Sequence, residues 1–241
     1  EKRLDKYISN PLCKRWQIIS PNVIAVFSRK LELKMNKPVY SGFSVLELSK
    51  FHMYEFFYCK LQKIVPWNRV ELCMTDTDSF LLNLKVEDVY QFIKDNLTLF
   101  DTSNYPPTHP CFSMERNKVV GKFKDETGSR PISKFIGLRS KLYSFLVGNE
   151  NDDEVVNKCV AKGVKSSVKC RKLNFNLYKK SLFERSVHVE KFSMLRSYNH
   201  SMFQVECAKI CLSPYDDKRY IAEDGLNTLP FGHYSLNTST D

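Results

Sequence analysis

The fold around the candidate site is decided by the stretch Val70-Glu71-Leu72-Cys73-Met74-Thr75-Asp76-Thr77-Asp78-Ser79-Phe80-Leu81-Leu82-Asn83-Leu84. Two short, mostly apolar runs flank four polar residues, which is the pattern of two strands joined by a hairpin turn. The turn carries two acids, Asp76 and Asp78. Side chains two apart on an extended strand end point to the same face. The spacing therefore predicts two carboxylates that are presented together.

Two adjacent carboxylates disfavour each other unless a cation lies between them or a proton is shared. Hard oxygen ligands suit Mg²⁺, which completes its shell with water and substrate phosphates, and a pair of such ions ~3.5–4 Å apart serves phosphoryl transfer. An EF-hand is excluded because Phe80 and Leu81 stand where that loop needs an oxygen ligand and a glycine. The spacing alone leaves an ordinary solvated acidic turn as the alternative.

A long helix is expected directly before this hairpin. Ser44 and Glu47 have the spacing of a capping box, and apolar residues recur at steps of three or four from Phe51 to Val65. A helix over 44–65 would be ~30 Å long, enough to support a whole sheet. Further strands are expected at 22–28, 31–35, 119–124, 141–147 and 154–164, and further helices at 86–96 and 174–183. These elements predict an α+β fold with an antiparallel sheet backed by helices.

A second candidate feature is basic and aromatic. If residues 137–143 form one strand, Arg139, Lys141 and Tyr143 share a face. The two cations would contact a phosphate backbone, and the phenol would pack against a sugar or base. An edge strand with solvated charges is the alternative.

Charge is unevenly distributed along the 241 residues, whose net charge is +10. The segment 155–180 holds eight Lys and Arg and no acid, whereas 71–101 holds seven acids and two lysines. A basic surplus indicates a polyanionic partner. The two segments together suit a protein that holds metal ions in one place and phosphates in another, although the basic segment could also be a merely solvated surface.

Several classes of protein are excluded or disfavoured. No apolar run approaches the ~20 residues needed to cross a bilayer, and the first residues lack a secretory signal, so an intracellular protein without a membrane partner is expected. The eight cysteines form no CxxC pair, which disfavours a structural zinc site.

The motifs resemble those of one known family. Thr75-Asp76-Thr77-Asp78-Ser79 resembles the third polymerase motif of family B DNA polymerases, Lys141-Leu142-Tyr143 resembles their Lys-x-Tyr motif, and 121–126 resembles the segment before it in the protein-primed branch. Other stretches, 36–43, 46–50, 213–220 and 231–234, are similar to polymerases of Polinton/Maverick transposons and related virus-like elements. The resemblance covers about 19–234.

This resemblance implies the later part of a right-hand polymerase. Residues 1–165 would be the remaining part of the palm, and 166–241 would be the thumb and C-terminal region, with the exonuclease and fingers portions absent. The implied activity is template-directed DNA synthesis from dNTPs onto a primer 3′-hydroxyl with two Mg²⁺ ions, or Mn²⁺ in their place. Implied partners are primer–template DNA, dNTPs, a terminal protein primer and the rest of the polymerase chain. The implied location is the host nucleus, or the cytoplasm for a virus.

The resemblance also assigns roles to residues. Asp78 would be the direct metal ligand and Asp76 a supporting acid near the triphosphate. Thr77 and Ser79 would shape the turn, and Lys141 and Tyr143 would hold the primer terminus. The residues that would grip the DNA backbone are Arg139, Lys162, Gly163, Lys165 and Lys169, with Gly163 allowing a close approach.

Departures from the family pattern define the rival hypotheses. Met74 replaces the usual tyrosine, and the first and second polymerase motifs and the exonuclease carboxylates have no counterpart here. We therefore expect a C-terminal fragment of a longer chain that is inactive alone. One rival is a non-catalytic DNA-binding palm–thumb remnant. Another is an unrelated metal-dependent phosphotransferase or nuclease, which would need further carboxylates near Asp76 and Asp78.

Overall fold

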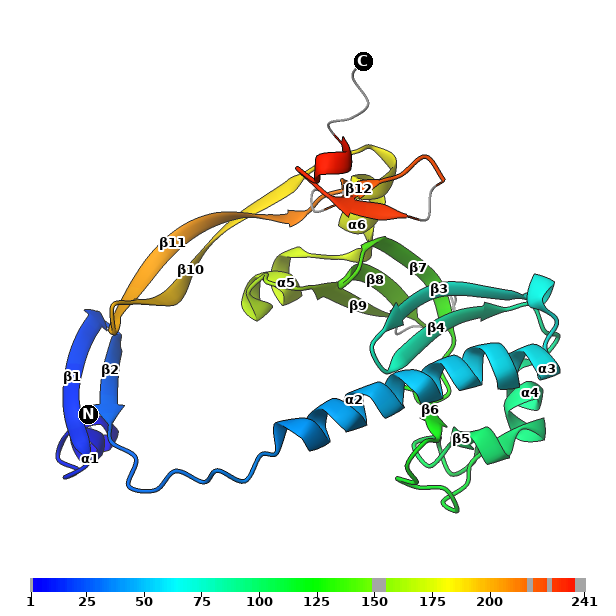
Figure 1. Ribbon diagram of the computed structural model, residues 1–241, viewed down its shortest axis with the longest axis horizontal. Coiled ribbons are helices and arrows are strands. Elements are labelled where there is room, and N and C mark those ends of the chain that lie inside the picture. The colour runs from blue at the N-terminus through cyan, green and yellow to red at the C-terminus, as the bar shows by residue number, and fades with distance from the viewer. Residues whose placement is uncertain (1, 149–154, 216–218, 225–226, 237–241) are drawn as a thin grey trace. The chain divides into compact units, whose positions relative to one another are not determined.

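The computed structural model describes residues 2–148, 155–215, 219–224 and 227–236, and it has an α+β fold (Figure 1). The chain divides into two compact units. Unit 1 consists of 1–45 and 189–209, and unit 2 of 46–188 and 210–241. The palm–thumb boundary expected after residue 165 follows from the resemblance and stays a prediction.

Unit 1 begins with helix α1 (Lys2–Ile8) and the antiparallel strands β1 (Cys13–Ser20) and β2 (Val23–Ser28). The strand predicted at 22–28 is therefore confirmed, but the one predicted at 31–35 is wrong. Its apolar residues Leu31, Leu33 and Met35 are 71–95% exposed and pair with no strand, because β2 pairs with β1 instead.

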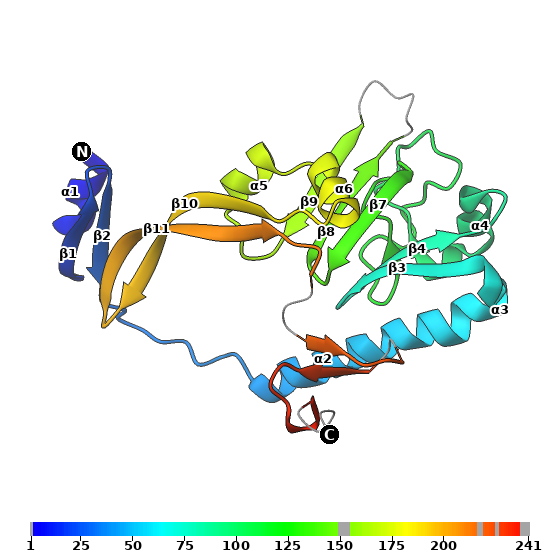
Figure 2. The ribbon, with the colours of Figure 1, turned by 90° about the horizontal axis from the view of Figure 1, so that it is seen from above.

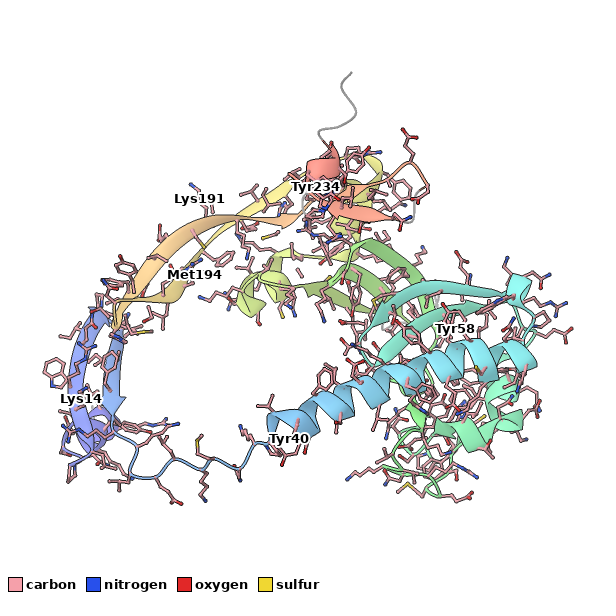
Figure 3. All side chains as sticks on the ribbon, viewed as in Figure 1. Lys14, Tyr40, Tyr58, Lys191, Met194 and Tyr234 are labelled. Atoms are coloured by element: carbon pink, nitrogen blue, oxygen red, sulfur yellow. The ribbon has the colours of Figure 1, made fainter. Side chains whose placement is uncertain are left out.

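Unit 1 also contains a long hairpin formed by β10 (His188–Tyr198) and β11 (Ser201–Leu212), which extend slightly beyond the unit. Its turn residues, Asn199 and His200, both have positive φ, as a two-residue type I′ turn requires. Lys191 and Met194 lie on opposite sides of the β10 ribbon (Figure 3). At the tip, the side-chain amide of Gln17 exchanges two hydrogen bonds with the backbone of Met202.

The long helix begins earlier than predicted. It comprises α2 (Val39–Tyr54), the π-helical η1 (Glu55–Leu61) and α3 (Gln62–Ile64). The capping box is therefore wrong: Ser44 lies in the second turn and donates to the carbonyl of Tyr40, while Glu47 pairs with Lys50. The helix begins directly after Pro38, because a helix begins readily beside proline. The carbonyl of Pro38 accepts the N–H of Gly42.

The first core of unit 2 lies under the quoted hairpin. Strands β3 (Val70–Asp76) and β4 (Ser79–Leu84) pair antiparallel, as predicted. The buried side chains beneath them come from the helix: Phe56, Phe57, Leu61 and Val65. Three of these belong to η1, whose wider turn brings the adjacent residues Phe56 and Phe57 inward together.

The peripheral elements of unit 2 are short. After 3₁₀ turn η2 (Trp67–Arg69) and the first hairpin come α4 (Val89–Asp95), capped by Asp88, and 3₁₀ turn η3 (Leu97–Leu99). The helix predicted at 86–96 is thus confirmed in a shorter form. The strand predicted at 119–124 contracts to β6 (Phe123–Lys124), which pairs in parallel with β5 (Phe100–Asp101). The later elements β12 (Arg219–Ile221), β13 (Thr228–Pro230) and η4 (Tyr234–Leu236) complete the unit.

The second sheet of unit 2 has the order β7 (Ile132–Arg139), β8 (Leu142–Val147), β9 (Val156–Ala161), with antiparallel pairs. Strands β8 and β9 match the predictions at 141–147 and 154–164, except that residue 154 lies outside the described residues. Helices α5 (Ser166–Lys172) and α6 (Phe175–Phe183) follow β9, and α6 contacts all three strands (Figure 2).

The buried face of α6 differs in part from the prediction. Phe175 and Tyr178 are buried as expected, and the hydroxyl of Tyr178 donates to the carbonyl of Val160. Leu182, predicted to face inward, is 38% exposed. Ser181 takes the buried position, because its hydroxyl donates to the carbonyl of Ser186 just beyond the helix. Within the described parts of the chain, no helix combines the length and apolar character that a membrane span requires.

Candidate functional site

The first part of the site is the tip of the β3–β4 hairpin. Asp76 and Ser79 form the last cross-strand pair, so Thr77 and Asp78 make a two-residue turn. The N–H of Asp78 donates to the carbonyl of Asp76 at 2.7 Å, and Ser79 Oγ donates to the same oxygen at 3.2 Å. Both acids lie at one tip. Because Asp76 ends β3 and Asp78 lies in the turn, the alternation of side chains along a strand does not place their two carboxylates on a common face.

Thr77 carries the conformational strain of this turn. Its φ is +60°, a left-handed conformation that a β-branched residue rarely adopts. Its hydroxyl donates to Asp76 Oδ1 at 3.2 Å, which partly offsets the strain. Such strain persists only where the surroundings fix the backbone, and it is concentrated at functional sites.

The second part of the site is the turn between β7 and β8. Arg139 pairs with Leu142, so Ser140 and Lys141 form the turn, and Lys141 also has positive φ. The expectation that Arg139, Lys141 and Tyr143 share one strand face is therefore wrong. Arg139 ends one strand, Lys141 is the turn, and Tyr143 belongs to the next strand. A reversal of the chain was missed because no Asn-Gly or Asp-Gly signal marks it.

The two hairpin tips are joined by an ion pair between Lys141 Nζ and Asp76 Oδ1. The side chains of Lys141 and Asp76 are 37% and 25% exposed. The hydrogen bond from Lys141 is the main cause that lowers the pKa of Asp76 below its ordinary value, and the charge of Lys162 lowers it further. Asp76 is therefore held as a carboxylate.

The backbone of Lys162 contacts this site. Its N–H donates to the carbonyl of Lys141 at 3.1 Å, at the point where β9 ends. Gly163 then turns the chain with φ +85°, and Lys165 precedes α5, which carries Lys169. The predicted basic residues thus begin beside the ion pair and continue along the next helix.

Tyr143 lies on the central strand of the second sheet, opposite Gly137 of β7 and Val160 of β9. Its ring is near those of Phe135 and Phe145, at centroid distances of 6.1 and 6.3 Å. Burial raises the pKa of the Tyr143 phenol, and the negative charge of Asp76 raises it further, so the hydroxyl keeps its proton.

A hollow of about 290 Å³ lies between β3 and the β7–β8 hairpin. Gly137 borders it, and a Cβ at this position would come within 3.1 Å of the Phe135 ring. Met74, which stands in place of the tyrosine of the motif that the sequence resembles, is also on its wall. The lining residues are Cys73, Met74, Thr75, Phe135, Gly137, Leu138, Arg139, Ser140 and Tyr143. This hollow was not predictable from the sequence pattern, because β7 was not predicted.

The donor set agrees with the magnesium chemistry that the resemblance implies. Asp76 and Asp78 supply two carboxylates, and Mg²⁺ at phosphate-transfer sites uses one or two carboxylates together with water and substrate phosphates. In the part of the chain that the structure describes, no three or more His, Cys, Asp and Glu side chains gather into a metal-binding group. Within the described residues, Asp76 and Asp78 are the carboxylates that the resemblance makes candidate metal ligands.

Comparison with protein-family models, with curated proteins and with solved structures gives no match for this chain.

Proposed function

We propose that this chain contributes the third polymerase motif and the Lys-x-Tyr motif to a family B DNA polymerase of the protein-primed type, similar to those of Polinton/Maverick elements. One observation carries the proposal. Asp76 and Lys141, which lie 65 positions apart, form an ion pair at the tips of two hairpins. The resemblance requires those two motifs to be neighbours.

In this proposal the α+β unit formed around β3, β4 and β7–β9 is the remaining part of a palm, and the residues after it form the thumb. Asp78 is exposed in its turn and available as the direct metal ligand. Asp76, which Lys141 keeps ionised, is the supporting acid beside Asp78. When bound, Mg²⁺ would stabilise the charge of the transferred phosphoryl group.

The proposed reaction is nucleotidyl transfer. The primer 3′-oxygen forms a bond to the α-phosphorus of a dNTP, the bond to the bridging oxygen breaks, pyrophosphate leaves, and the hydroxyl proton passes to solvent. The first and second polymerase motifs have no counterpart in the 241 residues. The proposal therefore requires both motifs from other parts of the polymerase, and this chain alone is expected to be inactive.

The residues around the carboxylates would position DNA. Lys141 and Tyr143 would hold the primer terminus, and Arg139 borders the adjacent hollow. Lys162, Gly163, Lys165 and Lys169 would contact the duplex backbone, which needs no reading of base sequence because pairing with the template selects the nucleotide. A terminal protein primer and location in a host nucleus, or in the cytoplasm for a virus, belong to the same proposal.

A second candidate is a DNA-binding remnant without turnover. The small carboxylate set favours it, because the described residues offer Asp76 and Asp78 without a third neighbouring donor. In this candidate the basic segment still binds DNA, but no nucleotidyl transfer takes place. It predicts DNA affinity that is indifferent to Asp78.

The test is primer extension by the complete polymerase that contains this chain. Asp78→Asn should reduce the extension rate by about 100-fold or more, because it removes stabilisation that acts in the transition state. Glu87→Gln, an exposed acid from the same acidic segment, is the matched control and should extend at the parent rate. Extension by Asp78→Asn near the parent rate would reject the role given to this carboxylate.

A further inference from the structure

The β1–β2 ladder of unit 1 has two faces of different character. Trp16 pairs with Val26 and Ile18 with Ile24, so these four side chains share one face. The alternate pairs, Arg15 with Phe27 and Gln17 with Ala25, lie on the other face, because paired residues of an antiparallel ladder point to the same side.

The second of these faces is occupied within unit 1. Gln17 hydrogen bonds to the backbone of Met202 at the tip of the β10–β11 hairpin, and Arg15 donates to the carbonyl of His200. The guanidinium of Arg15 also lies over the ring of Phe27, 4.3 Å from its centroid. This face therefore contributes to the packing of the unit.

On the face that carries Trp16, three of the four side chains are exposed and Val26 is half-buried. Trp16 is 50% exposed, Ile18 62% and Ile24 36%. Exposed apolar side chains that gather on one face of a strand pair mark an interaction site.

The charge of unit 1 indicates what the occupant is. Unit 1 contains 12 Lys and Arg and five Asp and Glu, a net charge of +7 on 66 residues. The segment 6–31, which includes both strands, has five basic residues and no acid. Lys14 is next to this face in the sequence and is exposed (Figure 3). A partner of strongly negative charge is therefore favoured.

An exposed aromatic ring in a unit with a surplus of positive charge is the arrangement that binds single-stranded nucleic acid. Bases stack on the ring, and the cations follow the phosphates. Bases in a duplex are already stacked on one another, so a half-exposed indole on a strand suits an unpaired base better.

We propose that the face of β1–β2 formed by Trp16, Ile18, Val26 and Ile24 binds single-stranded nucleic acid, with a base stacked on Trp16 and phosphates near Lys14. This inference goes beyond the proposed function, because it uses neither the carboxylate site nor the basic segment after β9. It stands if Asp78 proves to have no role in extension.

The test uses the fluorescence of Trp16. The chain has two tryptophans, so Trp67→Phe leaves Trp16 as the single reporter. Addition of an oligothymidylate of about 15 nucleotides should quench its emission, and the quenching should weaken as salt rises. Because this measurement keeps Trp16, it does not depend on the folding of a Trp16 variant.

Substitution then measures the contribution of the ring. With a fluorescein-labelled oligothymidylate, Trp16→Ala should weaken binding by about 5- to 100-fold, and Trp16→Phe by less, since a smaller ring still stacks. Phe183→Ala removes an exposed aromatic side chain from unit 2, where Phe183 is 70% exposed, and should leave the affinity unchanged.

Three results would overturn the inference. The first is unchanged Trp16 emission at saturating oligothymidylate. The second is a shift of that emission with vesicles containing phosphatidylserine but not with the oligonucleotide, which would assign the face to a lipid surface. The third is association of the chain with itself that Trp16→Ala abolishes, which would assign it to a second copy.

Discussion

At the scale of single residues, the pair Asp76–Lys141 links the electrostatics of the candidate site to its stability. The hydrogen bond from Lys141 lowers the pKa of Asp76 in the folded protein. A lowered pKa means that the stabilisation is present above the unfolded value, near 3.9, and is lost as pH falls through the folded value. Because both side chains are partly exposed, the pair contributes only about 0.2–1 kcal/mol.

We therefore predict that Lys141→Met raises the pKa of Asp76 toward its ordinary value, as followed by carbon NMR of the carboxyl group against pH. The free energy of unfolding should fall slightly at neutral pH and become equal to that of the parent in strong acid. Lys85→Met, which removes an exposed lysine from the same unit, should leave the pKa of Asp76 unchanged. An unchanged pKa in Lys141→Met would contradict the ion pair.

At the scale of elements, the π-helical η1 is the part of the long helix that packs against the β3–β4 hairpin. Leu61 is fully buried, whereas Cys59 of the same segment is exposed. We predict that Leu61→Ala lowers the free energy of unfolding by about 2–5 kcal/mol, because it leaves a cavity in the core. Cys59→Ala should change it by less than about 0.5 kcal/mol.

Urea unfolding in a Trp16→Phe background provides the measurement, since Trp67 is then the single tryptophan. Trp67 reports on this core because its ring is 5.0 Å from that of Phe57. Equal destabilisation by both alanine substitutions would show that η1 does not present Leu61 to the core.

The same elements show how far sequence can predict this fold. The β3–β4 hairpin was predictable because apolar runs flank a polar turn, and the helix was predictable from its apolar spacing. The start of that helix was not, because Ser44 and Glu47 have the spacing of a cap inside a helix that already began at Val39. For the site, the proximity of Asp76 and Lys141 came from the resemblance, whereas the hollow beside them depends on β7 and could not be predicted.

At the scale of the whole molecule, the net positive charge is divided unequally between the two units. Unit 1 has a net charge of +7, and unit 2 has +3 because its 22 acids offset most of its 25 basic residues. The basic segment after β9 belongs to unit 2, and the Trp16 face belongs to unit 1. Two nucleic-acid contacts with separate chemistry are therefore expected: an electrostatic contact to duplex DNA and a stacking contact to a single strand.

We predict that substituting Lys162, Lys165 and Lys169 together by glutamine reduces the slope of log affinity against log salt for duplex DNA by about 2–3, because each lost phosphate contact contributes about 0.9. The quenching of Trp16 by oligothymidylate should persist. Combined with Trp16→Ala, the two losses of binding free energy should add within about 0.5 kcal/mol, because the two proposed contacts belong to different units of the chain. The control is Lys85, Lys94 and Lys118 substituted by glutamine, which removes equal charge from unit 2. If that control lowers the duplex slope equally, net charge rather than the segment after β9 determines the affinity.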